Sequence, residues 1–250
     1  LLTEAGFHEV VLTGIHLGAY GIDLAARPTL ADACRTVLAE EGLRRLRLGS
    51  LESVELSADL LELMRTEPRF AAHLHLPLQA GSDAVLRAMN RHYDTAAFAR
   101  LLEEVRAAVP GVAISTDIIV GFPGETEADF AAGLDFVRQM GFARMHVFPY
   151  SPRKGTPAAR RTDQVPPMVR KERAARMQAL ADALAEEYHR AALGSDVDVL
   201  FETSEDGVTD GLTETYIRVY TDAPVTRGEI VPVRLTHLYR DGVWGELVSK

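Results

Sequence analysis

Residues 71–83 constrain the fold of this chain more than any other stretch. From residue 73 to residue 79, histidine, proline and glutamine alternate with leucine, which is the two-residue period of a β-strand. A Gly-Ser-Asp turn and a helical pattern follow. Polar side chains at the end of such a strand are typical of α/β proteins, which place their chemistry there. Taken alone, His73 or His75 is better explained as a buried, satisfied histidine, so the repetition of the pattern favours a site.

The alternation of strands and helices extends from residue 9 to residue 150. We expect five strands, at residues 9–14, 45–50, 73–79, 112–120 and 144–150. The helices expected between them lie at residues 29–41, 57–64, 84–89, 94–109 and 126–141. Connections of this length permit parallel crossovers, so the pattern predicts an α/β fold. A closed or nearly closed β/α barrel and a doubly wound sheet explain it equally well, although no Gly-x-Gly-x-x-Gly follows a strand.

The pattern changes in the last third of the chain. A long helix is predicted over residues 167–193, and its basic start is either a solvated face or an RNA contact. Beyond Gly194 we expect strands alone, at residues 196–202, 216–220, 229–235 and 245–248. Short strands separated by turns predict a small all-β barrel of the oligonucleotide-binding kind. The sequence therefore predicts two domains, residues 1–193 and residues 194–250.

Composition limits the partners and cofactors of the chain. The net charge of −9 provides no global attraction to nucleic acid, so an RNA contact must rely on local basic patches. Cys34 is the only cysteine and lies in a predicted helix. A single thiol cannot hold a structural zinc or an iron–sulfur cluster, so we expect no metal ligands here. No apolar run has the length of a membrane span, and we expect a cytoplasmic protein.

Five segments carry a resemblance to a known family. They are LTGIHLG at residues 12–18, RLGSLE at 47–52, HLHLPLQAGSD at 73–83, TDIIVGFPGET at 116–126 and HVFPYSP at 146–152. In this order they resemble the tRNA methylthiotransferases of the radical S-adenosylmethionine (radical SAM) superfamily. The amino-acid sequences of the segments at residues 12–18 and 146–152 are most similar to those of the subfamily that acts on threonylcarbamoyladenosine. The carboxyl-terminal β module resembles the RNA-binding TRAM domain of the family.

The resemblance implies a reaction and its cofactors. A [4Fe–4S] cluster, held by a Cys-x₃-Cys-x₂-Cys loop, would cleave S-adenosylmethionine to a radical, and a second [4Fe–4S] cluster would supply sulfur for a methylthio group on C2 of adenosine. Neither set of cysteines is present. We expect that the clusters belong to an amino-terminal part missing from this chain, and that this chain alone is inactive. The implied partners are the tRNA anticodon stem-loop, S-adenosylmethionine and a reducing partner for the cluster.

The resemblance also implies an S-adenosylmethionine pocket at the strand ends, although it assigns no catalytic residue. The second strand of the family's barrel would contribute Thr13 and Gly14. The next two strands would contribute polar groups, and the last two would pack on the adenine. These implied cofactor-binding residues are Ser50, Glu52, Gln79, Ser82, Ile119, Gly121, Val147 and Phe148. The usual glutamate of the adenine segment is displaced to Glu125, whose alternative role is a favourable charge at a helix start.

Two groups of residues are candidates for RNA contact. Arg153 and Lys154 lie in the loop that follows the last strand of the first domain. Tyr216, Arg218 and Tyr220 alternate on one predicted strand of the second domain, and an aromatic–arginine–aromatic strand can stack bases and touch phosphate. The alternative is that both tyrosines fill the core of the small barrel and that the arginines are solvated.

Two other functions compete with a radical enzyme that modifies tRNA. The chain could be a non-catalytic RNA-binding module on a β/α scaffold, or an unrelated β/α-barrel enzyme with a phosphate site. Within the resembling family, the substrate could also be isopentenyladenosine or a ribosomal protein. A Cys-x₃-Cys-x₂-Cys segment encoded upstream of Leu1 would decide for the radical enzyme.

Overall fold

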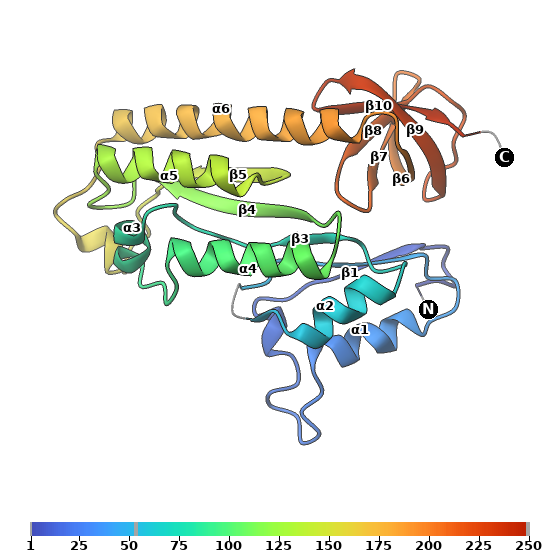
Figure 1. Cartoon of the computed structure of the whole chain (residues 1–250), viewed down its shortest axis with the longest axis horizontal. Helices are drawn as coiled ribbons and strands as arrows, with labels where there is room; N and C mark the ends of the chain where they lie inside the picture. Colours follow the sequence, from blue (N-terminus) through green and yellow to red (C-terminus); the bar gives the residue numbers. More distant parts are fainter. Residues whose placement is uncertain (1, 53–54, 249–250) are drawn as a thin grey trace. The chain divides into compact units, whose positions relative to one another are not determined.

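The computed structural model describes residues 2–52 and 55–248 (Figure 1). The chain divides into two compact units. The first, which we call the terminal unit, comprises Leu1–His75, Ala108–Ala113 and Glu186–Lys250. The second, the central unit, comprises Leu76–Ala107 and Ile114–Ala185. Among the described residues, no helix is long and apolar enough to cross a membrane.

Parallel strands form the first part of the terminal unit. Strand β1 (Glu9–Leu12) pairs with β2 (Arg45–Leu48), and Ser50, just beyond β2, bridges to His75 at the end of β3 (His73–His75). A short 3₁₀ helix, η1 (Leu17–Ala19), and helix α1 (Leu30–Leu38) connect β1 to β2, and α2 (Ala58–Thr66) precedes β3. The strand expected over residues 9–14 therefore ends at Leu12, two residues before the glycine.

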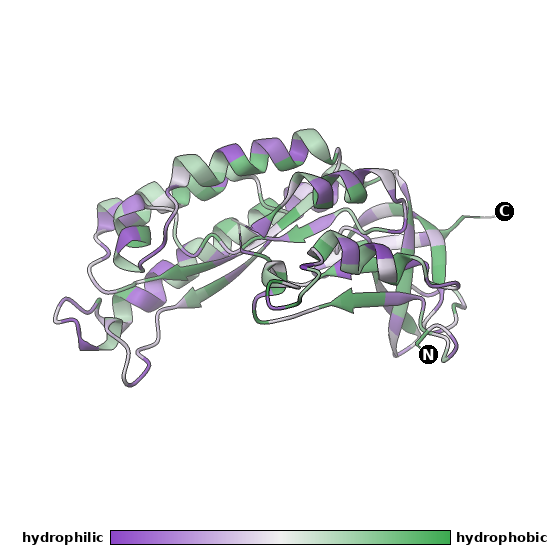
Figure 2. Ribbon diagram, turned by 90° about the horizontal axis from the view of Figure 1, so that it is seen from below, coloured by the Kyte–Doolittle hydropathy of each residue, from purple (hydrophilic) through white to green (hydrophobic). Residues whose placement is uncertain are grey.

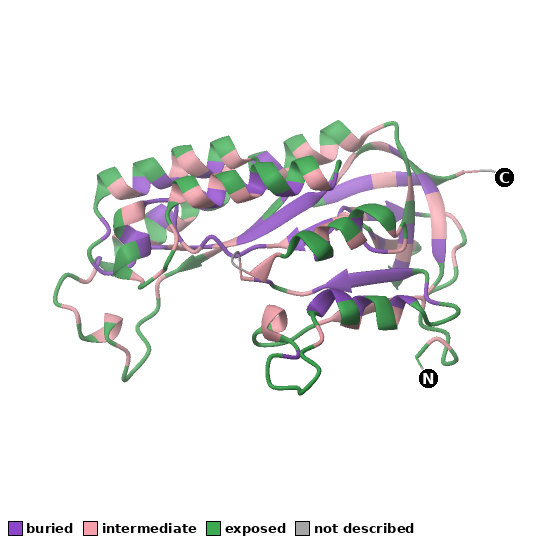
Figure 3. Ribbon diagram, turned by 60° about the horizontal axis from the view of Figure 1, so that its bottom comes forward, coloured by how far each residue is buried: buried purple, intermediate pink, exposed green. Residues whose placement is uncertain are grey.

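Local sequence explains where the helices begin. Thr29 and Asp32 form a capping box at the start of α1, and the Ser57 hydroxyl accepts the Leu60 N–H at the start of α2. These oxygens satisfy backbone donors that have no partner within the helix. Hydrophobic and hydrophilic residues alternate along the helices (Figure 2), and the buried residues follow the hydrophobic faces (Figure 3).

The last part of the chain forms a closed five-stranded barrel within the terminal unit. Its strands lie in the order β10-β8-β7-β6-β9. Their bounds are β6 (Asp196–Glu205), β7 (Val208–Thr213), β8 (Arg218–Thr221), β9 (Ile230–Tyr239) and β10 (Gly242–Leu247). Apolar side chains from these strands, with Phe201 and Val233 fully buried, fill its centre.

The structure corrects the sequence interpretation of this barrel in two places. Strand β7 was not predicted; its residues Asp210 and Gly211 are more typical of turns than of strands. Gly211 instead lies in a strand, where a Cβ atom would stand 2.2 Å from the carbonyl oxygen of Leu200, so the glycine permits a close approach of two backbones. The second correction concerns Tyr216, which lies in the turn before β8 and not on the strand.

A buried arginine cluster joins this barrel to β1 and β2. Arg47 is fully buried, and its guanidinium donates to Glu9 Oε1 at 2.9 Å and to the carbonyls of Thr213 and Glu214 at 2.9 and 2.6 Å. The guanidinium also lies 3.9 Å from the ring centroid of Tyr216. Arg45 donates to Glu9 Oε2 at 3.0 Å and to barrel carbonyls. The donors that a buried guanidinium must satisfy thus tie the two parts of the terminal unit together.

The central unit is built on β4 and β5, with helices between its strands. Strand β4 (Ala113–Val120), which begins at the unit boundary, pairs in parallel with β5 (Arg144–Pro149). The other elements are α3 (Asp83–Ala88), α4 (Thr95–Ala108), α5 (Glu127–Met140), the 3₁₀ helix η3 (Ala158–Arg160) and the first part of α6 (Pro167–Ala192). The expected helices are confirmed here to within one or two residues, and the chain as a whole is mixed α/β with a sheet-rich carboxyl-terminal part.

The strand expected over residues 73–79 is shorter than predicted, because its second half has irregular backbone. Residues 76–79 are held along β4 by the buried Thr116 hydroxyl, which donates to the carbonyl of Leu76 at 2.7 Å and accepts the Leu78 N–H at 2.9 Å. Gln79 then adopts a left-handed backbone with φ of 71°. Its N–H donates to the Asp117 carbonyl at 2.9 Å and its carbonyl accepts the Ile119 N–H at 2.8 Å. This backbone is strained for residues other than glycine, asparagine and aspartate, and so for a glutamine.

We expect Arg47→Met to destabilise the chain by about 3 kcal/mol, because it removes one member of a buried ion pair with Glu9 and the hydrogen bonds to the carbonyls of Thr213 and Glu214. Urea denaturation followed by the fluorescence of Trp244, which lies in the barrel, measures the loss. The matched control is Arg65→Met, since Arg65 forms an exposed ion pair with Glu62 that contributes less than about 1 kcal/mol. Equal losses for the two variants would contradict the role given to Arg47.

We expect Gln79→Gly to be more stable than Gln79→Ala by about 1 kcal/mol, because both lose the same side chain and only glycine accepts the left-handed backbone without strain. The comparison is a difference between two urea midpoints. At Gln178, an exposed position within α6, the same pair of substitutions should give the opposite order, with glycine about 1 kcal/mol less stable. If alanine is the better residue at both positions, the backbone of Gln79 is not strained.

Candidate functional site

A pocket of about 860 Å³ opens in the central unit, at the carboxyl ends of its strands. Residue Gln79, the end of β4 and the end of β5 form one wall, and the loop after β5 forms another. The lining includes Gln79, Asp117, Ile119, Phe122, Phe148 and Arg153. A large pocket with apolar walls and a few polar groups has the character of a small-molecule site.

Three of the residues predicted to bind the cofactor line this pocket together. Gln79 bridges to Ile118, and Ile119 is the register partner of Phe148 on β5. Because these are adjacent positions on neighbouring parallel strands, their side chains reach the same edge of the sheet. Ile119 and Phe148 supply apolar surface, with 48% of Phe148 exposed, while Gln79 supplies an amide. Their chemistry fits the adenine and a polar group of S-adenosylmethionine.

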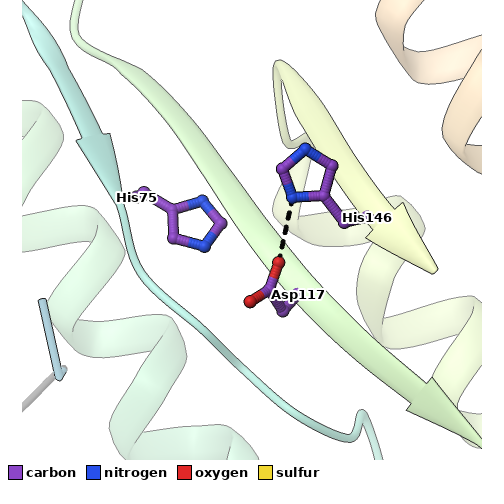
Figure 4. A group of neighbouring side chains, drawn as sticks. All are labelled: His75, Asp117 and His146. Atoms are coloured by element: carbon purple, nitrogen blue, oxygen red, sulfur yellow. Dashed lines mark hydrogen bonds and ion pairs between the residues drawn. The ribbon is translucent and has the colours of Figure 1, made fainter. Parts of the chain in front are cut away.

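A histidine and a carboxylate lie side by side near this edge. Asp117 on β4 and His146 on β5 are register partners, and His146 Nδ1 lies 3.0 Å from Asp117 Oδ1 (Figure 4). Asp117 also lines the pocket. The third residue in the figure, His75, belongs to the terminal unit. The pair gives the pocket an acceptor that a hydroxyl or an ammonium group of a ligand can use.

Three other predicted residues of the central unit do not line the large pocket. The Ser82 hydroxyl donates to Asp129 Oδ1 at 2.8 Å, at the start of α5. Gly121 has a left-handed backbone, and the side chain of Arg170 occupies the space where a Cβ atom would stand. Val147 pairs with Ile118 within the sheet. Their roles toward a cofactor remain predictions.

The predicted residues of the terminal unit gather at the ends of its own strands. A Cβ atom on Gly49 would lie 3.3 Å from the Thr13 hydroxyl, so the ends of β1 and β2 are adjacent. Gly14 begins the loop that leads to η1. Ser50 is exposed beside β3, and the N–H of Glu52 donates to Glu55 Oε2 at 3.1 Å. Their assignment to the cofactor stays a prediction.

Glu125 is part of a buried ion pair next to Gly121. Its carboxylate accepts the Gly121 N–H at 2.9 Å and a hydrogen bond from Arg173 on α6 at 2.8 Å. Burial raises the pKa of this carboxyl group, while the Gly121 N–H and Arg173 act in the opposite direction. Both alternatives weighed for Glu125 thus omit its principal contact, which fastens the loop after β4 to α6.

The predicted RNA contacts divide into accessible and occupied side chains. Arg153 lines the pocket and Lys154 is exposed; within the described residues, neither side chain has an ion-pair partner. Arg218 pairs with Asp210 at 2.5 Å. Tyr220 is 7% exposed and hydrogen-bonds to Asp241, and Tyr216 lies against Arg47. Arg153 and Lys154 therefore remain the accessible candidates, and contact of the other three with RNA stays a prediction.

Sequence reasoning missed several residues of the site. Asp117 and His146 went unnoticed because each lies within a predicted strand, at residues 112–120 and 144–150, and not at its carboxyl end. Asn90 and Arg91 also line the pocket, just after α3. An asparagine at the end of a predicted helix is a usable signal, since Asn tolerates the left-handed backbone that Asn90 adopts with φ of 59°.

The residues present do not fit an iron–sulfur cluster. Cys34 is the only cysteine of the chain and lies fully buried in α1. Burial raises the pKa of its thiol to about 11, so it disfavours the thiolate that a metal requires. We therefore assign no step of chemistry to a cluster held by these residues.

The sequence of this chain matches a known family and several proteins of known function. The family described as "Radical SAM superfamily" matches residues 2–137. The threonylcarbamoyladenosine tRNA methylthiotransferase MtaB of Bacillus subtilis is 38% identical over 99% of this chain and 57% of its own length. The tRNA-2-methylthio-N(6)-dimethylallyladenosine synthase of Mycobacterium ulcerans is 41% identical over 96% of this chain and 49% of its own length. The chain thus spans about half the length of the curated relatives it matches.

A solved structure supports the fold. The coproporphyrinogen III oxidase HemN of Escherichia coli, described as a radical SAM enzyme, aligns over 83% of this chain and 54% of its own, with a TM-score of 0.55 and 16% sequence identity. Since the family match covers more than half of the residues and the sequence segments that resemble the family lie at the strand ends, the chain belongs to the radical SAM superfamily.

Proposed function

We propose that this chain is part of a tRNA methylthiotransferase that adds a methylthio group to C2 of threonylcarbamoyladenosine beside the anticodon. The observation that carries the proposal is the similarity to methylthiotransferases along nearly the whole chain, at 38% identity over 99% of it for MtaB. Such a match extends through both units and not only through the radical SAM segment. Because tRNA is the proposed substrate, we also propose that the activity is cytoplasmic.

The pocket of the central unit is the proposed site for S-adenosylmethionine. Ile119 and Phe148 would pack on the adenine, and the Gln79 amide would meet a polar group of the ribose or methionine moiety. When bound, S-adenosylmethionine supplies the radical that abstracts hydrogen and the methyl group that the sulfur carries. The residues of this chain bind and orient that cofactor, while an aromatic and apolar wall keeps water away from it.

The choice of threonylcarbamoyladenosine rests on two segments. The sequences of residues 13–16 (Thr-Gly-Ile-His) and residues 148–151 (Phe-Pro-Tyr-Ser) resemble those of that subfamily. Overall identity does not favour this substrate, since the Mycobacterium ulcerans relative named for the dimethylallyl substrate is 41% identical and the Bacillus subtilis MtaB is 38% identical. The five-stranded barrel is the proposed TRAM domain, and Arg153 and Lys154 are proposed to hold tRNA phosphates beside the pocket.

Deleting the gene that encodes this chain should remove 2-methylthio-N6-threonylcarbamoyladenosine from total tRNA, and a plasmid copy should restore it. Mass spectrometry of digested tRNA measures the nucleoside. A copy with Ile119→Asp should fail to restore it, because a carboxylate in the apolar wall opposes adenine packing. A copy with Arg65→Met, an exposed change in α2, should restore it fully.

Two results would overturn parts of this proposal. Loss of the methylthio group from dimethylallyladenosine alone would show that the substrate is wrong. An unchanged set of nucleosides in the deletion strain would overturn the assignment to tRNA modification.

A further inference from the structure

A row of aromatic rings crosses three neighbouring strands of the barrel. Trp244 on β10 is the register partner of both Tyr220 on β8 and His237 on β9. The His237 ring stacks on Trp244 at a centroid distance of 6.1 Å and an interplanar angle of 22°. Tyr239 meets Trp244 edge-on at 5.0 Å and Tyr220 at 5.2 Å. We call Tyr220, His237, Tyr239 and Trp244 the aromatic row.

The aromatic row lies on the outside of the barrel. Val243 and Leu238, which neighbour Trp244, His237 and Tyr239 in sequence, point inward and belong to or pack against the barrel core. Since side chains alternate along a strand, the rings face outward. His237 is exposed, Tyr239 and Trp244 are half-buried, and Tyr220 is buried beneath them. The core of the barrel is therefore complete without the three outer rings.

A cation is held over this row at a structural cost. Arg240 begins the two-residue turn between β9 and β10, with its guanidinium carbon 5.4 Å from the ring centroid of Tyr220 and 5.1 Å from that of Tyr239. Its φ is 50°, at a turn position where glycine is preferred. A strained residue that could be glycine is an indication of function.

The charge of the barrel limits what this surface can bind. Residues 196–247 contain eleven carboxylates and four arginines. Arg218 is paired with Asp210, and Arg234 with Asp196. A surface with so few available cations cannot derive its affinity from phosphates, whereas stacked aromatic rings attract the faces of nucleobases without regard to sequence.

We propose that the aromatic row, with Arg240, stacks nucleobases of single-stranded RNA. The inference rests on the proposed function in one respect, that the substrate is an RNA with unpaired bases. It departs from the strand predicted from sequence, because the contact is made by His237, Tyr239 and Trp244 and depends on stacking more than on phosphate neutralisation. Binding to the row should therefore weaken only slightly as salt rises, with a logarithmic slope of about one, as for one phosphate contact.

The chain reports on this contact directly, because Trp244 is its only tryptophan. Titration of the full chain with a short oligoadenylate should quench the tryptophan fluorescence to saturation, since a base stacked on indole quenches it. A blunt RNA duplex of the same length has no accessible base faces and should leave the fluorescence unchanged. Saturable oligoadenylate binding with constant fluorescence would overturn the proposal, as would equal quenching by the duplex.

Two substitutions test the row without disturbing the barrel core. Tyr239→Ala should weaken oligoadenylate binding about 5- to 100-fold, the loss expected for one stacked base. Arg240→Gly should also weaken it, while raising the melting temperature because glycine relieves the turn; a weaker-binding but more stable variant cannot be explained by misfolding. Arg234→Ala, which changes an ion-paired residue on the same strand, is the control and should bind as the parent does. Parental affinity for both test variants would overturn the proposal.

This experiment is independent of the modification reaction. Oligoadenylate binding requires neither S-adenosylmethionine nor a cluster. Quenching by oligoadenylate together with unchanged tRNA nucleosides in the deletion strain would retain the RNA surface and reject the methylthiotransferase. Loss of the nucleoside without quenching would do the reverse.

Discussion

The terminal unit depends on the satisfaction of one buried cation, Arg47. If the donors of a guanidinium that is buried away from water have no acceptor, the folded state is destabilised by several kcal/mol. In this chain the acceptors are Glu9 on β1 and the carbonyls of Thr213, at the end of β7, and Glu214, which follows it. The two segments are more than 200 residues apart in sequence. The same contacts hold Arg47 opposite Val11 in the β1–β2 register. The register of the first strands and the attachment of the barrel are therefore not independent features.

Sequence reasoning succeeded where the physics is local or periodic. The helices expected from residues 29 and 126 begin there, where Thr29 and Thr126 form capping boxes with Asp32 and Asp129. The family resemblance implied Gln79, Ile119 and Phe148 as cofactor-binding residues, and these three line one pocket. It failed where the decisive contact is distant. Nothing near Arg47 in sequence announces that it is buried, and Gly211 resembles a turn glycine until a second backbone is seen to approach it. The aromatic row was missed for the same reason, since its rings come from three strands whose register only the folded barrel defines.

In the central unit, buried polar contacts fix the backbone around the pocket. Thr116 satisfies two backbone groups of residues 76–79, and Glu125 with Arg173 fixes the loop that follows β4. Because these buried contacts hold the backbone in place, the side chains of Gln79, Ile119 and Phe148 are not needed to fix it. The pocket can therefore present Gln79, Ile119 and Phe148 to a ligand without rearrangement of the sheet, which is the preorganisation that binding sites require.

Gln79 and Arg240 share a property that matters to anyone who engineers this chain. Each occupies a left-handed backbone where glycine would be more stable. A screen that selects for heat resistance alone would therefore enrich glycine at both positions. The resulting protein would be sturdier and would lack an amide at its pocket and a cation over its aromatic row. Thermal tolerance and chemical competence are thus opposed at these two residues.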